Sequence, residues 1–215
     1  AVSGFHNILF IGPPGTGKTM LAKRIPTIMP SLTFEESLEL TKIYSIAGLL
    51  SSKRPLIKAR PFRSPHHTSS SAALAGGGRI PGPGEVTLAH RGVLFLDEMP
   101  EFARGSLEVL RQPLEDKQIQ LSRASGTYVF PAGFILVAAM NPCPCGYYPD
   151  MNKCRCTPGE VSHYLHKLSQ PLLERIDLCA DVPPVNFSQI SGEKSGESSA
   201  LIRKRVEKAR RIQQK

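Results

Sequence analysis

The sequence lacks any uninterrupted apolar run close to the roughly 18 residues that a helix needs to cross a bilayer. The amino terminus also lacks the basic stretch and long apolar region of a secretory leader. The first absence argues against a membrane-spanning segment and the second against export, so we expect a soluble, cytoplasmic protein with no membrane partner. An initiator Met is missing too, and the chain closes inside a charged helical pattern, which predicts a fragment of a longer protein.

Cysteines and acidic residues are both scarce. Five cysteines in 215 residues are few for a secreted disulfide scaffold, and an odd number leaves at least one unpaired, so we expect reduced thiols or a metal site. The 18 acidic residues are outnumbered by 27 basic ones, a net charge of +9. This charge favours nucleic acid as a partner, with ordinary solubility charge as the alternative. The length suits a single α/β domain.

A glycine-rich segment near the start carries the strongest functional pattern. Residues 12–19 read GPPGTGKT and fit the phosphate loop G-x-x-x-x-G-K-[ST]. The backbone N–H groups of such a loop hydrogen-bond nucleotide phosphates, while Lys18 reaches the β/γ-phosphates and the Thr19 hydroxyl ligates Mg²⁺. The flanks agree, because residues 7–11 form an apolar strand pattern and residues 20–25 a helical one. The alternative is a plain turn between a strand and a helix.

Polar residues follow two further apolar strand patterns. Residues 93–96 are continuously apolar, as in a buried parallel strand, and lead into Asp97 and Glu98. We predict that Asp97 holds Mg²⁺ through its water shell and that Glu98 polarises the attacking water. Asn141 ends the apolar run 134–140 and is expected to orient that water. The alternatives are carboxylates that close a strand or cap a helix, and an Asn in an ordinary turn. The predicted nucleotide-binding residues are therefore Gly12, Pro13, Pro14, Gly15, Thr16, Gly17, Lys18, Thr19 and Asp97.

Phosphoryl transfer also requires positive charge near the γ-phosphate. Arg175 is our candidate, supplied across a subunit interface; the alternative is that it pairs with Glu174 or Asp177. The predicted catalytic residues are Lys18, Glu98, Asn141 and Arg175.

Four of the five cysteines form two C-x-C pairs, Cys143 with Cys145 and Cys154 with Cys156, eight residues apart. Four thiolates on a looped segment can enclose one Zn²⁺ ion tetrahedrally. Structural zinc sites mostly use C-x-x-C, so free thiols are the alternative. A structural role is favoured over a catalytic one, because four sulfur ligands leave no open position for a substrate.

Three segments in the first half of the chain carry further structural predictions. Thr33 and Glu36 form a capping-box pattern before a helix that ends at Gly48. Residues 51–85 are rich in Pro, Gly, Ser and basic residues, and we expect a functional or disordered loop. Adjacent His66 and His67 on an extended segment should point opposite ways, which favours surface or loop-packing roles over metal binding.

The second half is expected to continue with regular elements. Leu107, Leu110 and Leu114 predict one helix, bent or ended near Pro113. Residues 118–130 read as a β-hairpin and residues 178–182 as a last strand. A polar stretch after residue 186 reads as a linker, and a basic amphipathic helix follows it.

These motifs, in this order, resemble the AAA+ ATPases, and within them the magnesium-chelatase-like branch that includes the ComM (YifB) family. The resemblance covers most of residues 4–184. It rests on the phosphate loop and on the strings PFRSPHH (61–67), GGG (76–78), PGE (83–85) through LAH (88–90), GVLFLDE (92–98), SRA (122–124) and AAMNPCPCG (138–146). It implies a P-loop NTPase three-layer α/β sandwich with a five-stranded parallel sheet. The AAA+ core would span residues 1–184, and residues 185–215 would hold a linker and the first part of a truncated helical lid.

The resemblance also implies roles for individual segments. It implies that the protein is a homo-hexamer with ATP at the subunit interfaces. In that assembly Asn141 would be sensor 1, and Arg175 would be the finger that acts on a neighbouring subunit. Residues 51–85 become a helix insert, residues 118–130 the hairpin before sensor 1, and residues 143–156 a cysteine loop. In related ring motors the insert and the hairpin touch DNA. Backbone phosphate contacts are therefore expected from Arg63, Arg79, Lys117 and Arg123, each of which is otherwise a solvated charge.

The function implied is an ATP-driven ring motor on single-stranded or branched DNA, of helicase or branch-migration type, in recombination during natural transformation, with ATP and Mg²⁺ as cofactors. The alternatives are the ATPase subunit of a magnesium chelatase, a transcription-regulator AAA+ ATPase and a nucleotide-gated scaffold. The cysteine loop and the basic charge argue against the chelatase subunit. The lack of a Gly-Ala-Phe-Thr-Gly-Ala loop argues against the transcription regulator, and Glu98 argues against a scaffold that binds ATP without cleaving it.

Overall fold

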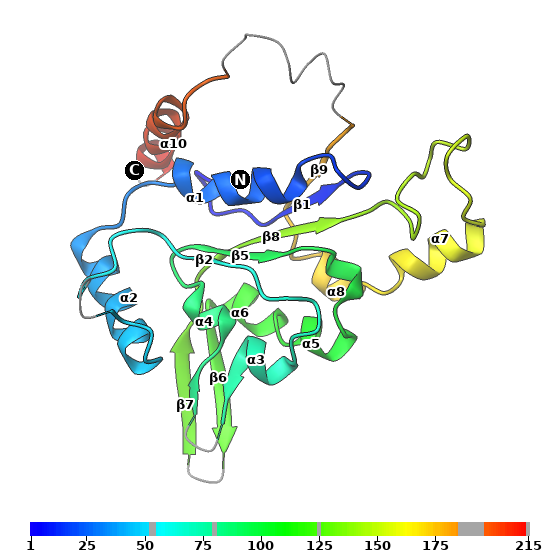
Figure 1. Cartoon of the computed structure of the whole chain (residues 1–215). Helices are drawn as coiled ribbons and strands as arrows, with labels where there is room; N and C mark the ends of the chain where they lie inside the picture. Colours follow the sequence, from blue (N-terminus) through cyan, green and yellow to red (C-terminus); the bar gives the residue numbers. More distant parts are fainter. Residues whose placement is uncertain (52–54, 79–80, 124–125, 185–195, 214–215) are drawn as a thin grey trace.

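The computed structural model describes residues 1–51, 55–78, 81–123, 126–184 and 196–213. Its centre is a five-stranded parallel sheet in the order β2-β5-β8-β1-β9 (Figure 1). The strands are β1 (Ile8–Ile11), β2 (Phe62–Arg63), β5 (Val93–Leu96), β8 (Ile135–Met140) and β9 (Leu178–Asp181). The predicted α/β fold with a five-stranded parallel sheet is confirmed.

The register of the strands brings three functional segments to one edge of the sheet. Ile11, the last residue of β1, pairs with Met140 in β8, and Leu96 of β5 pairs with Ala138. Because these strands are parallel, the segments that follow them all leave at the carboxyl edge, where open α/β sheets bind their ligands. Every residue of β5 and β8 is buried, which explains why both strands read as continuous apolar runs.

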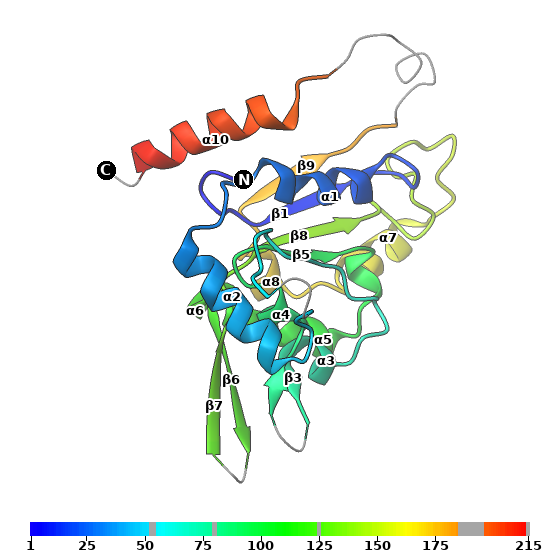
Figure 2. The ribbon, with the colours of Figure 1, turned by 60° about the vertical axis from the view of Figure 1, so that its left-hand side comes forward.

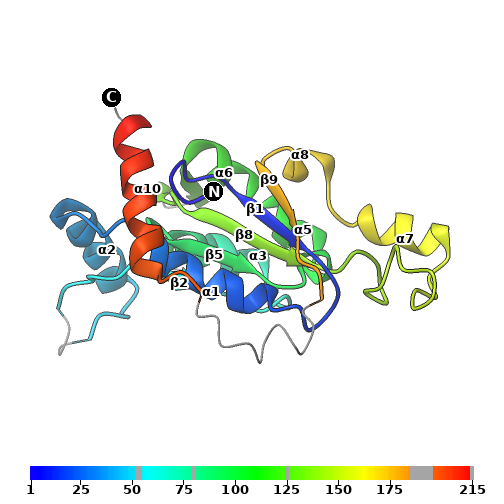
Figure 3. The same ribbon diagram turned by 90° about the horizontal axis from the view of Figure 1, so that it is seen from above.

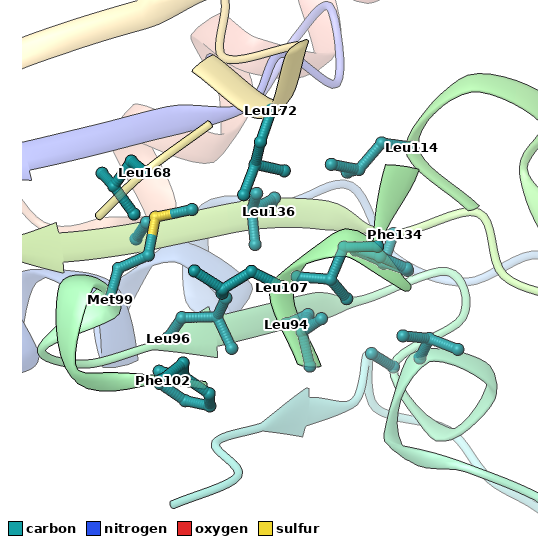
Figure 4. Close-up of a cluster of buried hydrophobic side chains, with 14 of the residues drawn as sticks. Leu94, Leu96, Met99, Phe102, Leu107, Leu114, Phe134, Leu136, Leu168 and Leu172 are labelled. Atoms are coloured by element: carbon teal, nitrogen blue, oxygen red, sulfur yellow. The ribbon is translucent and has the colours of Figure 1, made fainter. Parts of the chain in front are cut away.

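Helices cover both faces of the sheet (Figure 3). Leu94 and Leu136 belong to the larger core cluster, to which four α-helices between β5 and β9 contribute buried residues. These helices are α5 (Arg104–Glu108), α6 (Arg111–Asp116), α7 (Pro158–Leu165) and α8 (Gln170–Leu173). In this cluster the side chains of Leu107 and Leu172 lie against the strand residues (Figure 4). The segment between β8 and β9 packs on this face through α7 and α8.

The opposite face is covered by α1 (Lys18–Ile28), which buries Ala22 and Ile25 against Phe95 of β5. Helix α10 (Ser199–Gln213) lies across α1 (Figure 2). Arg203 of α10 holds it there by donating from Nε to the Thr27 carbonyl oxygen at 3.1 Å. None of the described helices combines the length and hydropathy needed to cross a bilayer.

One helix prediction is confirmed and one is wrong. Helix α2 (Phe34–Ile46) begins with the predicted capping box, in which Thr33 and Glu36 exchange two hydrogen bonds of 3.2 Å. The single helix expected through Leu114 is instead α5 and α6, which are separated at residues 109–110. Pro113 is the third residue of α6, within the first turn, where its missing N–H has no intrahelical partner to lose. The proline therefore follows the break rather than causing it.

Residues 51–85 are not one continuous loop. Within them β2 pairs with β5, Phe62 opposite Val93, and forms the edge of the central sheet. The sequence pattern missed β2 because its two residues are too few to show an alternation. Four short elements follow it: α3 (Ser71–Ala75), β3 (Gly76–Gly77), β4 (Gly82–Pro83) and, at the end of the segment, α4 (Glu85–Leu88). After β5 the chain forms the 3-10 helix η1 (Met99–Glu101).

Two hairpins project from the same side of the core (Figure 2). The longer consists of β6 (Gln118–Arg123) and β7 (Gly126–Pro131), as the sequence predicted, and the shorter of β3 and β4. Both tips lie outside the described residues. The two hairpins are neighbours, because a Cβ built on Gly77 would lie 3.2 Å from Nη2 of Arg123.

Buried Asn7 joins three segments at the amino edge of the sheet. Its Oδ1 accepts from the Leu136 N–H at 2.9 Å, and its Nδ2 donates to the Arg175 carbonyl oxygen at 2.8 Å. We expect Asn7→Ala to lower the free energy of unfolding by about 1–3 kcal/mol for each buried group left unpaired. Urea unfolding measures the loss; the exposed Asn152→Ala should change stability by less than about 0.5 kcal/mol. An equal effect of the two variants would contradict this role.

Candidate nucleotide-binding site

The phosphate loop follows β1 and is shaped by its glycines. Gly15 and Gly17 have φ values of +77° and +86°, in the left-handed region where side chains are strained. Gly12 is needed for a close approach, because a Cβ there would lie 2.2 Å from the Val182 carbonyl oxygen. The N-cap of α1 is Gly17, which has no side chain to occupy the N–H groups of the first turn. The loop and the helix start therefore offer backbone donors to an anion.

Lys18 lies inside this loop. Its Nζ donates to the carbonyl oxygens of Gly12 and Pro13 at 2.7 and 2.8 Å, and it is 3.3 Å from Oδ1 of Asn141. Burial lowers the pKa of the Lys18 amine, and the negative charges of Asp97 and Glu98 oppose that shift. Lys18 and Asn141, which the sequence placed in one site, are thus in contact.

Thr19 and Asp97 are likewise brought together from positions 78 residues apart. The Thr19 hydroxyl donates to Oδ2 of Asp97 at 2.7 Å. A hydroxyl and a carboxylate are hard oxygen donors of the kind that Mg²⁺ prefers. Thr19 and Asp97 could therefore hold a Mg²⁺ ion.

Glu98 occupies an unusual backbone position. Its φ of +51° is left-handed, and it is the N-cap of η1. Such conformations cost of order 1–3 kcal/mol in non-glycine residues and cluster at functional sites. The Glu98 side chain is 59% exposed, so its carboxylate is accessible to water.

His67 is a site residue that sequence reasoning missed. Its Nδ1 lies 3.6 Å from Oε2 of Glu98. The expectation that the two adjacent histidines point opposite ways is wrong: the ring centroids of His66 and His67 are 4.1 Å apart. Hydrogen bonds between residues 66 and 69 turn this segment, so the alternation of an extended strand does not apply. Glu98 follows His67 by 31 residues, so no local pattern in the sequence indicates that the two side chains lie close together.

A pocket of about 440 Å³ lies between the phosphate loop and the residues that follow β5 and β8. It is lined by Pro14, Gly15, Thr16, Gly17, Lys18, Thr19, Met20, Asp97, Glu98, Met140 and Asn141. Its donors are an ammonium group and backbone N–H groups, and its carboxylates lie beside the threonine hydroxyl. This set of donor and acceptor groups fits a nucleoside triphosphate with Mg²⁺.

Arg175 lies away from this pocket, at the opposite edge of the sheet. It precedes β9, whose first residue, Leu178, pairs with Ile8 at the start of β1. Its Nη1 donates to the Pro171 carbonyl oxygen, and its Nη2 pairs with Glu115, both at 2.5 Å. The ion-pair partner of Arg175 is therefore Glu115 rather than Glu174 or Asp177. Asp177 instead accepts from the Asn7 N–H at 2.6 Å.

The four cysteines between β8 and α7 form one cluster. Sγ of Cys143 lies 3.3 Å from Cys145 and 3.8 Å from Cys154, and all four sulfurs lie within 4.8 Å of one another. Four sulfurs bound at ~2.3 Å around a tetrahedral zinc ion are ~3.8 Å apart, so the spacing suits a metal ion. Backbone N–H groups of Tyr147 and Arg155 lower the pKa of the Cys145 thiol to about 6. The cluster can therefore supply a thiolate to a metal.

The four basic residues predicted to touch DNA lie in different surroundings. Arg63 makes two hydrogen bonds of 2.6 Å to Glu85, so its guanidinium is already committed within the chain. Lys117 ends α6 and donates to the Leu114 carbonyl oxygen at 2.7 Å. Arg123 is exposed near the tip of the β6–β7 hairpin, beside Gly77. Arg79 lies outside the described residues.

Comparisons with known proteins identify the family. Residues 1–190 match the family described as magnesium chelatase, subunit ChlI. The uncharacterized protein YifB of Escherichia coli K12 is 51% identical over 212 residues, 98% of this chain and 42% of YifB. Competence protein ComM of Haemophilus influenzae is 49% identical over 217 residues, 99% of this chain and 42% of ComM. The chain thus spans about two fifths of the length of these relatives.

A solved structure shares the fold. NtrX from Brucella abortus, crystallised in complex with ADP, superposes with a TM-score of 0.53 over 85% of this chain and 33% of NtrX, at 18% identity. The family match and the two relatives establish ancestry, while NtrX supports the architecture. The chain therefore belongs to the magnesium chelatase subunit ChlI family, in the AAA+ branch that contains ComM and YifB.

Proposed function

We propose that this chain is the ATP-hydrolysing core of an AAA+ ring motor that acts on DNA, of helicase or branch-migration type. The observation that carries the ATPase part is the 2.7 Å contact between Thr19 and Asp97, which joins the phosphate loop to the end of β5. In this proposal residues 1–184 are the nucleotide-binding core. Residues 185–215 are a linker and the first part of a helical lid, to which α10 belongs.

The residues of the pocket divide the chemistry between them. Lys18 and the loop N–H groups bind the phosphates, and Thr19 and Asp97 hold Mg²⁺. When bound, Mg²⁺ neutralises charge that develops on the phosphate oxygens. Glu98 accepts the proton of the attacking water, and the Asn141 amide, beside Lys18, orients that water. His67 contacts the Glu98 carboxylate and keeps it oriented.

Assembly into a homo-hexamer would complete the site. Arg175 and the phosphate loop lie at opposite edges of one sheet, which supports action of Arg175 on the nucleotide of a neighbouring subunit rather than on its own. The buried Nε of Arg175 also has no hydrogen-bond partner among the described residues. A charged group that is incompletely satisfied within its own chain suits a role at an interface.

The DNA part of the proposal rests on the two neighbouring hairpins and on the net charge of +9. Arg123 is the preferred phosphate contact, with Lys117 at the base of β6; Arg79, which lies outside the described residues, stays a candidate from the sequence alone. Arg63 is not retained, because binding a phosphate would break its ion pair with Glu85. Relatedness to a competence protein supports DNA as the partner.

DNA should stimulate the ATPase of the full natural protein. We expect single-stranded or forked DNA to raise the rate of phosphate release, and Arg123→Ala to weaken DNA affinity and reduce the dependence of binding on salt by about one counterion. Arg205→Ala is the matched control, because Arg205 is an exposed arginine on α10, away from both hairpins. A rate that no DNA changes would contradict the DNA part and leave the ATPase part intact.

A second candidate is the ATPase subunit of a magnesium chelatase-like complex. The description of the matched family favours it. ATP hydrolysis that responds to a porphyrin-binding partner but not to DNA would support this alternative.

We also propose zinc as the metal of the cysteine cluster. The protein is expected to carry one zinc ion per chain, because four thiolates enclose a single ion. Elemental analysis after dialysis measures it. Cys154→Ser should lower the zinc content, whereas Cys179→Ser, an exposed cysteine in β9, should not. Retention of zinc by the Cys154→Ser and Cys156→Ser double variant would contradict this site.

A further inference from the structure

The cysteine cluster is packed directly against the nucleotide site. Cys143 follows Asn141 by two residues, at the end of β8. Gly146 lies over the phosphate loop: a Cβ built on it would be 2.7 Å from Cδ of Pro14 and 3.8 Å from Cγ of Asn141. The loop therefore contacts both the phosphate-binding segment and the residue that orients water.

The carboxyl-terminal end of the cysteine loop also approaches Asn141. After Cys156 the chain enters α7 through a capping box formed by Thr157 and Glu160. Burial raises the pKa of Tyr164 in α7 to about 12, and the backbone N–H of Asn141 lies close enough to the phenol oxygen to oppose that shift. Asn141 is thus contacted from both ends of the segment that the cysteines close.

The loop has little apolar packing of its own to hold this shape. Its buried cluster consists of Cys143, Cys154 and Val161, while the side chains of Tyr147 and Tyr148 are exposed. In metal sites of this kind the binding energy of the ion supplies the folding energy of the loop. A metal in the cluster would therefore fix the position of Gly146 and of Asn141.

We propose that metal binding to the four cysteines and nucleotide binding to the phosphate loop are energetically coupled through Gly146 and Asn141. The inference rests on the proposed nucleotide site. Coupling between two sites is reciprocal, and typical values change affinity about 5–150-fold. Zinc should therefore strengthen nucleotide binding, and nucleotide should strengthen zinc binding by the same factor.

The test measures both directions on the full natural protein. ADP binding to the zinc-loaded and the zinc-stripped forms is measured by displacement of a fluorescent analogue, and we expect the Kd for ADP to rise about 5–150-fold on stripping. Zinc affinity is measured by competition with a chelating dye, with and without saturating ADP. We expect ADP to tighten zinc binding by a matching factor.

Two glycine variants separate coupling from folding. Gly146 has a φ of +86°, a left-handed conformation that Asn tolerates better than other non-glycine residues. Gly146→Asn keeps all four cysteines but places a Cβ against Pro14, so it should retain zinc, weaken nucleotide binding and lose the effect of ADP on zinc. Gly159→Ala is the control, because a Cβ there would meet no described atom within 4 Å; it should change neither affinity.

The outcomes are distinguishable. Equal nucleotide Kd values for folded zinc-loaded and zinc-stripped protein would overturn the inference. If stripping unfolds the protein, Gly146→Asn decides, and unchanged ADP-dependence of zinc affinity in that variant would overturn the inference. If the zinc-loaded wild type binds no nucleotide, the proposed function fails instead.

Discussion

Replacing Glu98 with Gln is expected to slow ATP hydrolysis by about 10²–10⁴-fold, the usual contribution of a positioned general base. The amide keeps the shape of the side chain but cannot accept the proton of the attacking water. In the proposed mechanism the phosphate and Mg²⁺ contacts belong to Lys18, Thr19 and Asp97, whose mutual contacts the substitution leaves in place. Nucleotide affinity should therefore change little.

Steady-state phosphate release and equilibrium titration with a nucleotide measure the two effects separately. Glu101→Gln is the matched control, because Glu101 is a nearby carboxylate in η1 that pairs with Lys167 at 3.0 Å rather than facing the pocket. Its hydrolysis rate should stay close to that of the wild type. A Glu98→Gln protein that hydrolyses ATP normally would show that another group activates the water.

Arg175→Ala should reduce hydrolysis by about 10³–10⁵-fold, the effect typical of an arginine supplied to the γ-phosphate by a neighbour. The loss should appear only where subunits assemble. Because Arg175 lies at the amino edge of its own sheet and the phosphate loop at the carboxyl edge, the two cannot meet within one chain.

Mixed assemblies distinguish this role from a structural one. An Arg175→Ala subunit keeps Glu98, and a Glu98→Gln subunit keeps Arg175, so mixing the two inactive proteins should restore part of the activity. A merely structural arginine, held by Glu115 and Pro171, would lower the thermal stability of its own subunit and give no rescue. Absence of rescue in assembled mixtures would thus exclude the neighbouring-subunit role.

Local patterns predicted the elements whose own residues determine them. The phosphate loop, the buried strands β5 and β8, the capping box of α2 and the β6–β7 hairpin were all readable, because each depends on neighbours in sequence. The break between α5 and α6 and the strand β2 were not. A two-residue edge strand forms because β5 offers backbone partners, and its own residues carry no periodic signal.

The candidate site divides in the same way. Lys18, Thr19, Asp97 and Glu98 belong to contiguous motifs, and the sequence identified them. His67 comes from a segment whose turn brings it to Glu98, and Gly146 reaches Pro14 only through the closed cysteine loop. Arg63, expected within a loop, instead lies in the edge strand β2 and pairs with Glu85, which no local pattern indicated.

The sequence by itself determined the chemical inventory of this protein: a loop of glycines with a lysine and a threonine, two carboxylates after an apolar strand, and four thiols at C-x-C spacing. These follow from residue type and spacing along the chain. Only the tertiary structure decided which groups meet, because parallel strand register and helix packing join residues far apart in sequence. It placed Thr19 against Asp97, Arg175 at the far edge of the sheet, and the cysteine loop over the phosphate loop.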